Sequence, residues 1–221
     1  MEAKTAIFDK LFGSGKKPAE AVPSVPTVRN VTIGRTVVLD PLIWRRHGDD
    51  LRFALDRDTL EIVAQGLIRL EDGAWVHRFY TSDDIMLQAV ADDREGQLAN
   101  DFTVFIPWSS DYPSGSTARR VWNERLRAPY FEDEGLPVYK RFWFGDEAAD
   151  QAPVTFWEDV YDERGAAAPS SRVFQTCMLF ARDLPGESRE LLLAIAVEPE
   201  KGDLTHDVMI GLPIGVGEFK A

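Results

Sequence analysis

The sequence predicts an α+β protein that is dominated by antiparallel β-sheet in meanders and hairpins, with a few short helices and a tethered N-terminal helix. Three observations lead to this fold class. From residue 28 onward, short segments rich in β-branched and aromatic residues alternate with turn-forming residues. These segments follow one another closely, without the helical crossovers that parallel strands need. Residues 3–12, in contrast, repeat apolar side chains at the spacing of one helix face.

An amphipathic helix and a linker rich in proline, glycine and small residues occupy residues 1–27 in this prediction. The apolar face of the helix includes Ile7, Phe8, Leu11 and Phe12. A helix of only about three turns is unstable alone in water, so this face needs a surface to pack against. We expect it to dock on a protein partner or on a second copy of the chain. Peripheral contact with a membrane and packing on its own domain are the alternatives.

Residues 28–221 are expected to form a single β-rich globular domain, and two packed halves that divide near residues 100–135 are the alternative. The strands expected first along the chain are residues 28–39, 59–70, 75–80, 85–91 and 102–108. The strands expected after them are residues 138–144, 154–161, 172–182, 190–197 and 208–213. Turn-forming residues separate most of these segments, which favours antiparallel pairing of sequential strands.

Two helices are expected within this domain. A short one is placed within residues 41–55, and a longer one runs from Ser116 to Arg127, with Ser116 or Thr117 as its N-terminal cap. The longest continuous apolar run of the chain extends from Leu191 to Val197. Such a run is typical of a strand that is buried on both faces, so we expect this strand at the centre of the sheet.

The formal net charge of −12 argues against nucleic acid as a partner, because an acidic protein repels the phosphate backbone. The N-terminus lacks the apolar stretch of a signal peptide. The longest apolar run is also far shorter than the ~20 residues of a membrane-spanning helix. We therefore expect a cytoplasmic protein without a transmembrane segment.

No motif for catalysis, metal binding or nucleotide binding is evident. The single cysteine, Cys177, lies among apolar residues that favour an inert thiol. Three dispersed histidines do not supply the ligand set of a zinc site, and neither a metal nor a cofactor is expected. Among the paired acids, Glu158 and Asp159 alone lie inside an aromatic strand, where perturbed carboxylates tend to occur. The sequence favours a protein without enzymatic activity and does not decide the question.

The aromatic residues offer one candidate ligand site around the irregular middle of the chain. The candidate residues are Trp108, Tyr112, Trp122, Trp143, Trp157 and Glu158. Pockets are commonly lined by aromatic rings with a few polar groups. Core packing is the competing interpretation and the favoured one, because most tryptophan side chains are largely buried.

Several stretches together resemble the YjfK-like family of bacterial proteins, a domain of unknown function. They are the tethered N-terminal segment, residues 36–41, the meander through Trp75, and the aromatic residues 139–144. The resemblance implies a cytosolic bacterial protein with no established activity, and it supplies no catalytic residue. Members are often encoded near a phage-shock-type coiled-coil protein, which implies a link to the membrane-stress response.

The sequence thus favours a non-enzymatic binding or adaptor domain that acts through protein–protein interaction. The alternative function is that of a small-molecule-binding protein, or of an unrecognised hydrolase, with an aromatic-lined cleft.

Overall fold

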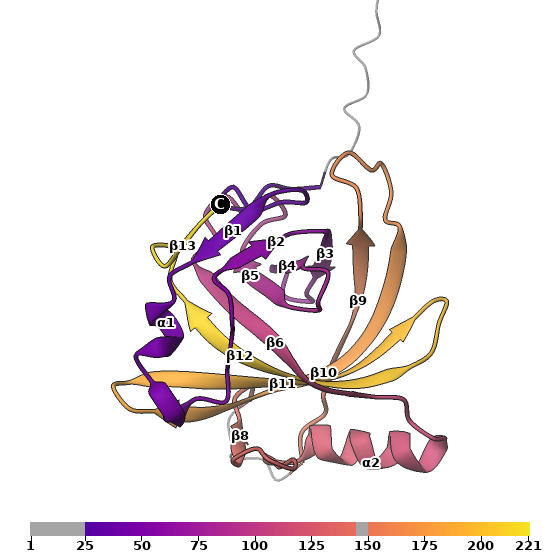
Figure 1. Ribbon diagram of the computed structural model, residues 1–221. Coiled ribbons are helices and arrows are strands. Elements are labelled where there is room, and N and C mark those ends of the chain that lie inside the picture. The colour runs from indigo at the N-terminus through magenta and orange to yellow at the C-terminus, as the bar shows by residue number, and fades with distance from the viewer. Residues whose placement is uncertain (1–24, 145–149) are drawn as a thin grey trace, which may run out of the picture.

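The computed structural model describes residues 25–144 and 150–221 (Figure 1). The predicted N-terminal helix, with Ile7, Phe8, Leu11 and Phe12, lies outside the described residues. The first described residues pack against the domain, since Val25, Val28 and Val31 are all buried.

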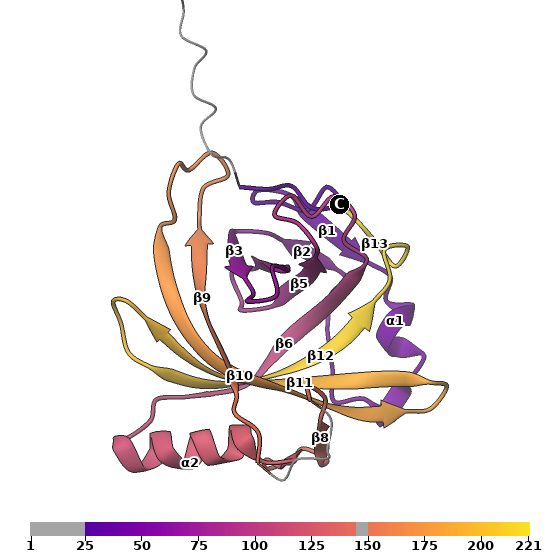
Figure 2. The ribbon, with the colours of Figure 1, turned by 180° about the vertical axis from the view of Figure 1, so that it is seen from behind.

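Eight strands pair into a closed antiparallel ring, which both ribbon views show (Figures 1 and 2). The ring consists of β3 (Ala64–Arg69), β4 (Trp75–Tyr80), β5 (Met86–Ala91), β6 (Asp101–Asp111), β12 (Thr205–Ile214), β11 (Ser188–Pro199), β10 (Ser171–Leu184) and β9 (Val154–Tyr161), in that order. The pairing of β9 with β3 closes it, and joins residues 158–161 to residues 65–68.

The predicted α+β class is therefore wrong, because the described chain is a mostly-β barrel with little helix. Its two α-helices are α1 (Leu42–Arg45) and α2 (Ser116–Arg127), with one 3₁₀ turn at Gly48–Asp50. The local pattern of hairpins is the same in an open sheet and in a closed ring. Only the pairing of strands that are distant in the sequence distinguishes the two.

Five shorter strands lie outside the ring. They are β1 (Thr36–Leu39), β2 (Thr59–Glu61), β7 (Tyr130–Phe131), β8 (Tyr139–Arg141) and β13 (Phe219–Lys220). The strands β13, β1 and β2 form a separate sheet in that order, while β8 pairs with β10 and carries β7 at its edge.

Two hydrophobic clusters cover the two faces of the barrel wall. The inner cluster includes Phe105, Cys177 and Leu193. The outer cluster joins the wall to the small sheet and to α2, and its members include Phe102 and Trp122. The alternation of side chains along each strand separates the two sets.

The predicted burial of Leu191–Val197 on both faces is confirmed for residues 191–196, which are all buried, while Val197 is half-buried. The reason differs from the expected one, because β11 belongs to a closed wall rather than to the centre of an open sheet. Odd-numbered residues of this run face the inner cluster and even-numbered residues face the outer one.

One predicted helix has the expected bounds, and one predicted strand is shorter than expected. The helix at Ser116–Arg127 is confirmed, but Gly115 is its N-cap and no side chain caps it. The expected strand 28–39 is reduced to β1, because Arg29 and Asn30 have φ values of 47° and 69° and form a tight turn. Neither α-helix of the described residues is long and apolar enough to cross a membrane.

Candidate functional site

The barrel encloses a cavity of about 460 Å³, and every one of the eight ring strands contributes to its lining. Volumes of roughly 300–1,000 Å³ are typical of small-molecule sites. The apolar part of the lining includes Met86, Leu193, Ile195, Val197 and Met209. The cavity opens to solvent at one end, because four of its lining residues are exposed: Asp84, Pro107, Ser110 and Ser171.

Glu158 is placed in the cavity wall by the alternation of β9. Glu158 and Val160 line the cavity, whereas Trp157, which directly precedes Glu158, points to the outside. The carboxyl group lies across Gly66 of the neighbouring strand β3, where a Cβ atom would overlap it. A glycine at this position is therefore required for Glu158 to reach its partners.

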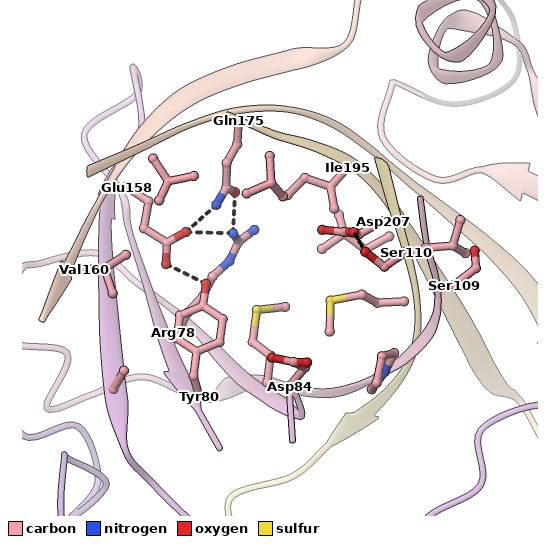
Figure 3. Close-up of a pocket in the computed structure, with 18 of the residues that line it drawn as sticks. Arg78, Tyr80, Asp84, Ser109, Ser110, Glu158, Val160, Gln175, Ile195 and Asp207 are labelled. Atoms are coloured by element: carbon pink, nitrogen blue, oxygen red, sulfur yellow. Dashed lines mark hydrogen bonds and ion pairs between the residues drawn. The ribbon is translucent and has the colours of Figure 1, made fainter. Parts of the chain in front are cut away.

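Four polar side chains form a buried network at the inner end of the cavity (Figure 3). Nη1 of Arg78 lies 3.2 Å from Oε2 of Glu158 and donates a hydrogen bond of 2.5 Å to Oε1 of Gln175. The hydroxyl of Tyr80 donates to Oε1 of Glu158 at 2.7 Å, and Nε2 of Gln175 donates to Oε2 at 2.5 Å. The Glu158 carboxylate thus accepts hydrogen bonds from three different side chains.

The network is shielded from water, since Arg78 is 3% exposed and Glu158 is 0% exposed. Burial disfavours the charged guanidinium, but Glu158, together with Tyr80 and Cys177, outweighs this effect, so the pKa of Arg78 is raised. Burial, together with the charge of Glu158, also raises the pKa of Tyr80 well above its usual value. Arg78 is therefore a permanent cation and Tyr80 a neutral hydrogen-bond donor at physiological pH.

The open end of the cavity carries further polar groups. Oγ of Ser110 donates to Oδ1 of Asp207 at 2.5 Å, and Oγ1 of Thr205 donates to Oδ2 at 3.0 Å. Asp84 adds a second carboxylate from the turn between β4 and β5. The cavity thus has a polar mouth, an apolar middle and a buried polar inner end.

The buried thiol of Cys177 belongs to the inner cluster, and burial raises its pKa to about 12. A thiol with this pKa stays protonated and is a poor nucleophile at neutral pH. In the part of the chain that the structure describes, no three His, Cys, Asp or Glu side chains are grouped to hold a metal ion.

The structure places the predicted ligand-binding residues in several different environments. Glu158 lines the cavity, while Trp143 lines a second hollow of about 480 Å³ toward the other end of the barrel. Trp122 lies on the buried face of α2 and stacks on His206, with ring centroids 4.6 Å apart.

The other three aromatic residues lie in neither hollow. Trp157 is on the outer face of β9, half-exposed, against Phe174. Trp108 is the extra residue of a bulge in β6, since Pro107 and Ser109 pair with consecutive residues of β12. Tyr112 follows β6 and is 73% exposed. The structure therefore brings Glu158, but none of the five aromatic side chains, to the cavity.

Sequence reasoning missed Arg78, Tyr80 and Gln175 as site residues. Each occupies an inward position of a strand whose other inward residues are mostly apolar. A charged residue in such a strand indicates a buried polar site, because a charge is rarely buried without a partner. Its partners come from β9 and β10, and could be assigned only once the strand pairing was known.

Comparison with known proteins identifies the family of this chain. Residues 7–220 match the family described as "Protein of unknown function (DUF2491)". The chain is 27% identical over 194 residues to the "Uncharacterized protein YjfK" of Escherichia coli (strain K12), which covers 86% of this chain and 84% of that protein. No solved structure matches the chain. The resemblance to the YjfK-like family is confirmed, and the chain belongs to the DUF2491 family of proteins of unknown function.

Proposed function

We propose that this protein is a non-enzymatic binding protein that holds a small, mainly apolar molecule inside its barrel. The observation that carries the proposal is the cavity of about 460 Å³ that all eight ring strands line. Protein interiors contain few voids larger than a water molecule, which occupies about 30 Å³ in the liquid. A cavity of this size is suited to a ligand.

The composition of the lining supports the same proposal. Apolar side chains surround the middle of the cavity, and a few fixed polar groups converge at its inner end. Small-molecule sites commonly combine an apolar wall with a small number of placed polar groups that orient the ligand. The proposed site keeps Glu158 from the sequence-based candidates and otherwise uses residues of the barrel interior.

Binding of the neutral, environment-sensitive dye Nile red tests this proposal. Val160→Trp places a large ring in the cavity, and Thr155→Trp places the same ring on the exposed outer face of the same strand. We expect saturable one-to-one binding to the wild type, at least a tenfold weaker affinity in Val160→Trp, and a change of less than twofold in Thr155→Trp. The measurement is a fluorescence titration, with circular dichroism to confirm that both variants are folded.

Two results contradict the proposal. One is the absence of saturable dye binding to the folded wild type. The other is equal binding to the two folded tryptophan variants, which would place the dye outside the barrel.

The adaptor hypothesis stays a separate prediction from the sequence. Its docking residues, Ile7, Phe8, Leu11 and Phe12, lie outside the described residues. The cytoplasmic location and the link to the membrane-stress response likewise remain predictions, which rest on the sequence pattern and on the family resemblance.

A further inference from the structure

The inner end of the cavity presents one hydrogen-bond donor that takes no part in the polar network of the described residues. A guanidinium group carries five N–H bonds. In Arg78, Nε donates to Oε1 of Gln88 at 3.0 Å, and Nη1 bonds to Glu158 and Gln175. Nη2 takes part in none of these hydrogen bonds between described residues, and it points toward the middle of the cavity (Figure 3).

The position of this donor is fixed by its surroundings. Arg78 is 3% exposed, its guanidinium lies 5.4 Å from the ring centre of Phe156, and three side chains hold its other nitrogens. A guanidinium N–H group is a charged donor, so a ligand that places an acceptor atom beside Nη2 gains a charge-assisted hydrogen bond.

The charges around the cavity select the kind of acceptor. Glu158 already balances the charge of Arg78. Arg78 is the only cation among the described residues that line the cavity, and the remaining charged lining residues are Asp84 and Asp207. A carboxylate ligand would place another negative charge beside Glu158 without a further cation to balance it. An uncharged acceptor oxygen satisfies Nη2 without this repulsion.

Building on the proposed function, we infer that the ligand is an uncharged, mainly apolar molecule with a carbonyl oxygen, such as a ketone, ester or amide. The carbonyl oxygen accepts a hydrogen bond from Nη2 of Arg78. The apolar body of the ligand lies along Met86, Leu193 and Ile195 toward the mouth.

A panel of ligands with similar chain length tests this inference by displacement of Nile red from the full-length protein. The panel consists of methyl decanoate, 2-undecanone, undecane and decanoate, measured at pH 7.5. We expect the ester and the ketone to displace the dye at concentrations at least tenfold lower than undecane or decanoate. Equal potency of decanoate and the ester, or of undecane and the ketone, would overturn the inference, as would a panel in which no member displaces bound dye.

Glu158→Gln sharpens the test, because it keeps the size of the side chain and removes the charge that balances Arg78. We expect this variant to prefer decanoate over methyl decanoate by at least tenfold. Glu190→Gln is the matched control, because Glu190 is also fully buried and paired with an arginine, Arg182, but does not line the cavity. Its preference for the ester should equal that of the wild type.

The outcomes separate this inference from the proposed function. Val160→Trp could abolish dye binding while the wild type prefers decanoate. This combination would overturn the inferred ligand class but support the proposed binding site in the barrel. A folded Glu158→Gln variant that keeps the preference for the ester would also overturn the inference. If that variant does not fold, the displacement series on the wild type decides the matter by itself.

Discussion

At the scale of single residues, neighbouring positions of β4 have opposite environments. Arg78 faces the cavity and is held by charged and polar partners. His77 faces the outside of the wall, is 0% exposed, and packs close to Val28 and Gly96. Neither of its ring nitrogens has a hydrogen-bond partner among the described residues, although the main chain of Asp93 lies nearby. Burial of this ring lowers its pKa below the usual value of 6.5.

This lowered pKa predicts a pH dependence of stability. Below about pH 6.5 the unfolded chain binds a proton at His77, while the folded chain binds it only at lower pH. The free energy of unfolding should therefore fall as the pH decreases from 7 toward 5. The contribution of this one group is at most about 1.4 kcal/mol per pH unit.

His77→Leu removes the titrating group from the same buried position. We expect the free energy of unfolding of this variant, measured by urea denaturation at several pH values, to decrease less steeply than that of the wild type between pH 7 and 5. Parallel curves for the two proteins would show that His77 does not contribute. Because other groups titrate in both proteins, only the difference between the curves is informative.

At the scale of elements, the hairpin of β10 and β11 is tied to two other segments by one buried carboxylate. Oε1 of Glu190 accepts hydrogen bonds from the main-chain N–H groups of Arg52 and Phe53, at 2.6 and 2.7 Å. Its Oε2 accepts from the Tyr139 hydroxyl at 2.7 Å and from Nε of Arg182 at 2.6 Å. Glu190 therefore anchors both β8 and the segment that precedes β2 to the barrel wall.

Replacement of this carboxylate should be strongly destabilising. Glu190→Ala leaves Arg182 and two main-chain donors without their acceptor, so we expect a loss of about 3–5 kcal/mol in the free energy of unfolding. Glu198→Ala is the control on the same strand, because Glu198 is exposed. Its effect should lie within about 0.5 kcal/mol. Chemical denaturation measures both, and a loss below about 1 kcal/mol in Glu190→Ala would contradict the anchoring role.

At the scale of the whole molecule, the first and the last strand of the described chain pair on the outside of the barrel. The C-terminal strand β13 pairs with β1, with Leu39 opposite Phe219. Phe219 is buried and packs on Phe102 of β6, with ring centroids 4.9 Å apart. The small sheet thus joins the outer cluster to the barrel wall and protects its apolar outer face from water.

Removal of the Phe219 ring tests this contact between the small sheet and the barrel. Phe219→Ala should lower the free energy of unfolding by about 3–5 kcal/mol, because it leaves a cavity in the outer cluster. Val216→Ala, in an exposed position three residues earlier, should change it by less than about 0.5 kcal/mol. Similar midpoints of denaturant unfolding for both variants would show that β13 adds little to stability.

The sequence by itself determined the family and several local elements. The helix Ser116–Arg127 and the strands Trp75–Tyr80 and Val154–Tyr161 have the predicted bounds, and the strand that contains Leu191–Val197 is buried on both faces. These features are readable because the period of apolar residues reports how one segment is buried, whatever its partners are.

The tertiary structure alone decided that the strands close into a ring, and so corrected the α+β class to a barrel. Closure of the ring creates a barrel interior, and Arg78, Glu158 and Gln175 contact one another there. Glu158 was a candidate from its sequence neighbours, yet its partner Arg78 lies 80 residues away. Pairing of this kind depends on the register between distant strands, which no local pattern encodes, because a shift of one residue exchanges the two faces of a strand.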